Sequence, residues 1–141
     1  MIRATILALT LSATAAIANP LIISDDMGGP LEDRMEILAN LRGSDRPVII
    51  RGKCYSSCTL YLGLPQTCVE PQAVFGFHGP SSSIYGLALP PDEFEYWSRI
   101  MADHYPPALA EWFMAKGRNV IVGGYFMSGS EVIRLGAREC E

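Results

Sequence analysis

The chain has 141 residues, a formal net charge of -4 at pH 7, 49% hydrophobic residues and 18% charged residues. This length fits one small domain, and the absence of basic runs interleaved with aromatic residues argues against a nucleic-acid partner. The apolar content predicts an association surface in addition to a core, so we expect a homo-oligomer.

Residues 1–18 have the pattern of a secretory signal peptide. Arg3 supplies a positive charge, a nearly unbroken apolar stretch follows it, and Ala16-Ile17-Ala18 fits an A-x-A cleavage signal. A transmembrane helix needs roughly 20 apolar residues, and no segment of the sequence reaches that length. We therefore expect cleavage after Ala18, a mature domain of residues 19–141 without a membrane span, and a periplasmic or secreted location.

The mature chain opens with a strand, a glycine turn and a helix. An apolar run at residues 21–23 predicts the strand, and apolar residues at helical spacing after Pro30 predict the helix. Gly28 and Gly29 in the turn permit backbone conformations that can aim an N–H group toward a site. An ordinary strand-to-helix turn is the alternative.

A second strand-to-helix junction follows the apolar run at residues 48–50. Ser56 lies at the carboxyl end of this predicted strand, and the next N–H groups belong to a helix N-terminus, where they can stabilise an anion. A third apolar run, residues 73–77, ends at His78, a candidate general base. This pattern is typical of a nucleophile and its general base. The alternative is a helix-capping serine and a structural histidine.

Three ordered motifs resemble those of the Clp protease proteolytic subunit and its crotonase-like relatives. Asp26-Met27-Gly28-Gly29 is similar to the family's Ser-Pro-Gly-Gly turn, and Gly52-Lys53-Cys54-Tyr55-Ser56-Ser57 to its Gly-x-Ala-x-Ser-Met turn. Phe77-His78-Gly79-Pro80 resembles the strand that ends in His-Gln-Pro. The variant Cys-x-Ser-x-Cys-Thr looks closest to a group of exported Clp-protease-like proteins.

This resemblance implies a role for four residues. Ser56 is the expected nucleophile and His78 its base, while the N–H groups of Gly28 and Ser57 form the expected oxyanion hole. Such a site implies a peptide or protein as the substrate.

The sequence differs from the family at the position of the catalytic acid. Residues 126–136 resemble the stretch that follows the family's catalytic aspartate, and the position matching that aspartate is Gly124. The acid normally fixes the histidine tautomer and stabilises the imidazolium. Asp103, at the end of a predicted helix, is a candidate replacement, and a solvated charge at a helix end is the alternative.

The mature chain has four cysteines, at positions 54, 58, 68 and 140. In an oxidising compartment an even number predicts disulfides, with three possible pairings. Zinc binding by Cys54, Cys58 and His78 is the competing interpretation, but the spacing is atypical, and we expect no metal and no cofactor. A Cys54–Cys58 bond would hold the junction around Ser56, and the family's late strand implies Cys68–Cys140.

The resemblance implies a truncated Clp-protease/crotonase-like α/β domain, with a mainly parallel sheet and strand–helix crossovers. Two functions follow from this fold. One is an exported, peptidase-like serine hydrolase using a Ser56–His78 dyad, weakened because Gly124 replaces the acid. The other is a catalytically inactive binding or assembly module.

Overall fold

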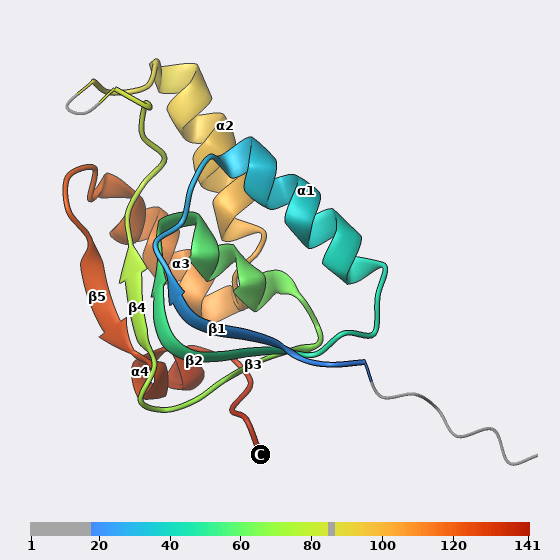
Figure 1. Cartoon of the computed structure of the whole chain (residues 1–141). Helices are drawn as coiled ribbons and strands as arrows, with labels where there is room; N and C mark the ends of the chain where they lie inside the picture. Colours follow the sequence, from blue (N-terminus) through green and yellow to red (C-terminus); the bar gives the residue numbers. More distant parts are fainter. Residues whose placement is uncertain (1–17, 85–86) are drawn as a thin grey trace, which may run out of the picture.

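The computed structural model describes residues 18–84 and 87–141 of the chain (Figure 1). Its elements in chain order are the strands and helices β1 (Leu21–Asp26), α1 (Leu31–Arg42), β2 (Val48–Tyr55), η1 (Ser56–Gly63), β3 (Thr67–Val69), β4 (Val74–Phe77), α2 (Pro91–Ala102), α3 (Pro107–Ala115), η2 (Gly117–Asn119), β5 (Tyr125–Ser128) and α4 (Gly129–Arg134). Apart from Ala18, the predicted signal peptide lies outside the described residues. None of the helices within the described ranges is long and apolar enough to cross a membrane.

The strands form one five-stranded sheet in which β2 is the central element. The order is β1-β2-β4-β5, with β3 attached to β2 off this path. On the edge opposite β1, the first half of β2 pairs with β3 and the second half with β4. All pairings of β2 are parallel, and β5 is antiparallel to β4. The predicted fold class, α/β with a mainly parallel sheet, is confirmed.

Apolar side chains of the central strands make the core. Val48 and Ile50 of β2 and Phe75 of β4 are fully buried in the core. Phe77, also from β4, packs edge-on against the Trp112 ring of α3, with ring centroids 5.4 Å apart. Burying each of these large apolar side chains stabilises the fold by roughly 1.5–3 kcal/mol. Figure 1 shows α4 apart from the other helices, beside β4 and β5.

Both predicted disulfides are present in the structure. Cys54 is bonded to Cys58 and Cys68 to Cys140, and no cysteine within the described ranges is free. The zinc interpretation therefore fails, because its two cysteine ligands are bonded to each other.

The structure has one short strand that the sequence did not predict. Cys68 belongs to this strand, β3, which is separate from the strand β4 that leads to His78. Pro71 lies between β3 and β4, where a residue without an N–H group cannot continue a ladder. On the side away from β2, Val69 of β3 pairs with the C-terminal segment through a parallel bridge to Glu139.

Candidate active site

Ser56 lies at a strained turn between β2 and η1. Its φ angle is +59°, the one positive value among the non-glycine residues that the structure describes. A left-handed conformation costs an ordinary residue about 1–2 kcal/mol. Two contacts hold the turn, because the Cys54–Cys58 disulfide spans it and the Thr59 hydroxyl donates to the Ser56 carbonyl oxygen at 2.8 Å. A strained backbone that its surroundings enforce is typical of functional sites.

The glycine turn packs directly against this serine. Gly28 has a φ of +92°, and a Cβ placed on it would lie 2.6 Å from the Cβ of Ser56 and 2.9 Å from the carbonyl oxygen of Tyr55. Glycine is therefore required here both for the backbone angle and for the close approach. The two turns that the sequence predicted as parts of one site are in contact.

A buried arginine ties the two turns together. Arg34 of α1 is only 6% exposed and forms an ion pair with Asp26, with a nitrogen–oxygen distance of 2.9 Å. Its Nε also donates to the Ser57 hydroxyl at 3.4 Å, and its guanidinium lies 4.7 Å above the centre of the Tyr61 ring. Burial raises the pKa of the Tyr61 phenol, and the Arg34 charge opposes that increase.

Sequence reasoning missed Arg34. Its position three residues after Leu31 and four before Leu38 puts it on the apolar face of α1, and Leu38 is 1% exposed. A charged residue on a buried helix face needs an internal partner, which Asp26 supplies. A charged residue within the apolar face of the predicted helix was therefore the sequence feature that could have identified Arg34.

The expected oxyanion hole needs a correction at Gly28. The N–H group of Gly28 donates to Asp26 Oδ1 at 2.8 Å, so the glycine turn uses it internally. Gly29, with a φ of +143°, lines the pocket beside Ser56, and its N–H group has no hydrogen-bond acceptor among the described residues. The Ser57 N–H group lies in the first turn of η1, where N–H groups lack helical partners. Gly29 and Ser57 are therefore the candidate donors.

His78 follows β4 and lines the same pocket as Ser56. Its Nδ1 lies 2.7 Å from the carbonyl oxygen of Gly79. Because a carbonyl oxygen only accepts hydrogen bonds, Nδ1 carries the proton, and in the neutral ring Nε2 is left with its lone pair. Within the described parts of the chain, no hydrogen bond joins His78 to Ser56.

The Tyr55 ring packs against Gly124, the position that the sequence resemblance matched to a catalytic acid. A Cβ at Gly124 would lie 2.6 Å from Cε2 of the Tyr55 ring, and that ring lies 5.4 Å from the His78 ring, centre to centre. The Tyr55 hydroxyl donates to the carbonyl oxygen of Gly123 at 2.6 Å. Asp103 is exposed at the C-terminal end of α2 and does not line the pocket, so the structure does not bring it to His78.

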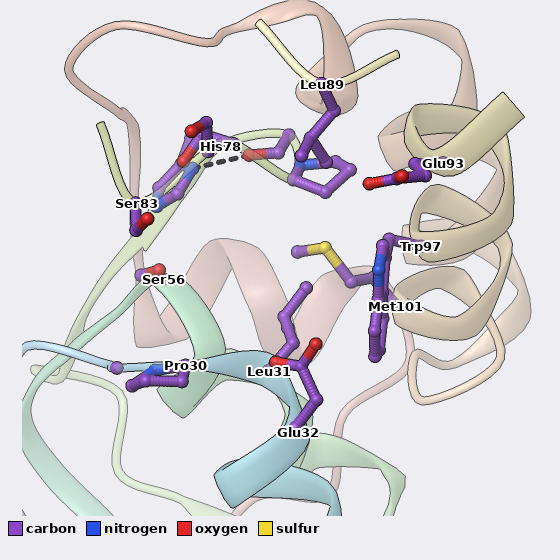
Figure 2. A pocket seen from close by; sticks show the side chains of 15 residues that line it. Pro30, Leu31, Glu32, Ser56, His78, Ser83, Leu89, Glu93, Trp97 and Met101 are labelled. Carbon is purple, nitrogen blue, oxygen red and sulfur yellow. Dashed lines mark hydrogen bonds between the residues drawn. The ribbon is translucent and has the colours of Figure 1, made fainter. Parts of the chain in front are cut away.

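Ser56, His78 and Gly29 line a pocket of about 560 Å³, within the roughly 300–1,000 Å³ range of small-molecule sites. The segment from His78 to Ser83, after β4, also lines it. Figure 2 shows Glu93, Trp97 and Met101 of α2 on the facing wall. The cavity thus brings together a serine hydroxyl, an imidazole and the turn at Gly29, while Ser57 follows Ser56 in the chain without lining the cavity.

Comparisons with known proteins support the fold. No protein-family model and no curated protein sequence matches the chain. Among solved structures, it is similar to a lysine-to-alanine mutant of the 1510-N membrane-bound stomatin-specific protease in complex with a substrate peptide, with 21% sequence identity and a TM-score of 0.65. The match covers 84% of this chain and 58% of that chain, so this chain spans little more than half the length of that protease. The likeness shows that this chain shares the fold of that protease.

Proposed function

We propose that the mature chain is an exported serine hydrolase of the peptidase type. The observation that carries the proposal is the enforced left-handed conformation of Ser56, which faces the same pocket as His78. The fold it shares with a protease whose structure holds a peptide supports a peptide or protein substrate. The two disulfides are consistent with the oxidising compartment that the predicted signal peptide implies.

In the proposed reaction, Ser56 Oγ attacks a peptide carbonyl carbon while Nε2 of His78 takes the hydroxyl proton. The N–H groups of Gly29 and Ser57 bind the resulting oxyanion. The imidazolium then gives its proton to the leaving amine, which leaves an acyl group on Ser56. Water hydrolyses this ester with His78 as the base, and the free enzyme is regenerated.

The Gly79 carbonyl takes over part of the role of an acid. It fixes the tautomer of His78 through the 2.7 Å contact to Nδ1. It carries no full charge, so it stabilises the imidazolium less than a carboxylate does. In a serine protease triad, replacing the aspartate by a neutral group reduces turnover about 10⁴-fold. We therefore expect slow hydrolysis by this chain.

The test is labelling of the purified mature protein with a fluorophosphonate probe. We expect slow labelling that the Ser56→Ala variant abolishes. Ser83→Ala is the matched control, because Ser83 is an exposed serine that lines the same pocket, and its variant should label as the original protein does. Labelling that persists in Ser56→Ala but is lost in Ser83→Ala would identify a different nucleophile.

An inactive binding or assembly module is the second candidate. It is favoured by the lack of a Ser56–His78 hydrogen bond and of a carboxylate partner for His78 within the described residues. A folded wild-type protein that no fluorophosphonate labels, and that hydrolyses no peptide, would support this second function.

A further inference from the structure

Two carboxylates line the candidate active-site pocket. Glu32 comes from the first turn of α1 and Glu93 from the first turn of α2. Within the described ranges neither has an ion pair or a hydrogen bond, whereas Glu95, two positions from Glu93, binds both Arg99 and Arg118. No lysine or arginine is among the lining residues. The pocket therefore carries negative charge that the protein leaves unpaired.

The wall between these carboxylates is apolar. Figure 2 shows Trp97 and Met101 between Glu93 and Glu32, with the Glu93 side chain directed into the cavity. Such a surface suits an aliphatic chain, and an indole ring attracts cations through its π-electrons. A ligand that matches both features has an apolar stem and a positively charged end.

The helix dipole alone does not explain why Glu32 and Glu93 line the pocket. Acidic residues at a helix N-terminus favour the helix wherever their side chains point. Asp33 and Asp92 occupy the same first turns as Glu32 and Glu93, and neither lines the pocket. Each helix thus has one acid directed to the cavity and one directed elsewhere.

We infer that this pocket binds a lysine or arginine side chain of the peptide. Trp97 and Met101 contact the aliphatic stem, and the positive charge is attracted by Glu32 and Glu93, which lie at the two ends of this wall. The cleavage of such a peptide rests on the proposed function, but the binding of the side chain does not. Both carboxylates are exposed, and exposed ion pairs are weak, so each carboxylate should account for roughly a two- to fivefold difference in affinity.

Binding is tested without chemistry, in the Ser56→Ala protein. N-acetyl-argininamide, N-acetyl-norleucinamide and N-acetyl-glutamamide are titrated and followed by NMR. We expect the arginine ligand to bind severalfold more tightly than the norleucine ligand, and more weakly as salt is added. Glu32→Gln and Glu93→Gln should each weaken arginine binding roughly two- to fivefold. The matched controls Asp33→Asn and Asp92→Asn should leave it unchanged.

Equal binding of the arginine and norleucine ligands, or no binding of either, overturns the inference. So does an equal loss in the control variants, because the effect would then be one of general surface charge. Reaction is measured separately, with peptide phosphonates carrying a lysine-like or a norleucine side chain and the unmodified Ser56. Preferential binding of arginine without any phosphonate labelling supports the pocket and contradicts the hydrolase. Equal labelling by both phosphonates supports the hydrolase and contradicts the pocket.

Discussion

Tyr55 is next to three residues of the candidate site. It directly precedes Ser56 in the chain, and its ring lies beside the His78 ring and packs on Gly124. Because its hydroxyl is held by the carbonyl oxygen of Gly123, the ring cannot move away without losing a hydrogen bond. An acid introduced at position 124 therefore meets an occupied space.

We predict that Gly124→Asp alone destabilises the protein by about 1–3 kcal/mol, as overpacked substitutions do, and does not accelerate labelling of Ser56. Urea unfolding and the labelling rate measure the two effects. In the Tyr55→Ala background the same substitution has room, so Gly124→Asp should raise the labelling rate above that of Tyr55→Ala. A Gly124→Asp protein as stable as the original would show that Tyr55 yields easily and does not define the site.

Among the elements, the junction of β2 and η1 depends on the short disulfide, whereas the attachment of the C-terminal segment depends on the long one. Cys54–Cys58 joins residues four positions apart, and Cys68–Cys140 joins residues 72 positions apart. On the chain-entropy model, closing these loops stabilises the fold by about 2 and about 4 kcal/mol, respectively. Removal of the two disulfides should therefore have different effects on the protein.

We predict that replacing Cys68 and Cys140 together by alanine lowers the free energy of unfolding by about 4 kcal/mol and leaves the labelling rate of the folded protein nearly unchanged. Replacing Cys54 and Cys58 together should cost about 2 kcal/mol but slow the labelling of Ser56, because the strained turn loses one of its constraints. Equal effects of the two double variants on labelling would contradict this division.

The sequence predicted the elements whose apolar pattern is regular. The strand at residues 21–23, the helix after Pro30 and the order of the serine and histidine turns all have local signals, and both disulfide pairs were expected. The separate strand β3 was missed because its three residues are too few to show a period. The role of Tyr55 was missed because its contacts with Gly123 and Gly124 join segments that only the folded sheet brings together.

At the scale of the whole molecule, β5 leaves one side of the sheet open. It pairs only with β4, so its other edge has unpaired backbone groups within the described sheet. Phe126 and Tyr125 of β5 are 63% and 48% exposed, and Val74 on the neighbouring strand is 44% exposed. Figure 1 shows β5 at the outer edge of the sheet. An uncharged edge strand of this kind favours pairing with another chain, which supports the proposed homo-oligomer.

We predict that Phe126→Lys shifts the sedimentation of the mature protein from an oligomer to a monomer, because a charged side chain on an edge strand opposes pairing. Ile37→Lys is the matched control, since Ile37 is an exposed apolar residue of α1, 42% accessible. That variant should sediment as the original protein does. A mature protein that is monomeric at every concentration tested would exclude this role of β5.

The two disulfides also differ in the moment at which they can form. If the chain is exported as proposed, it enters the oxidising compartment N-terminus first, so Cys54, Cys58 and Cys68 are available well before Cys140. During that interval Cys68 is a free thiol near a newly formed bond in its own chain, and thiol–disulfide exchange can pair it with Cys58 or Cys54. Recovery of the native pairing then requires Cys140 to arrive and displace the wrong partner. The yield of natively paired protein on export should therefore depend on a disulfide isomerase.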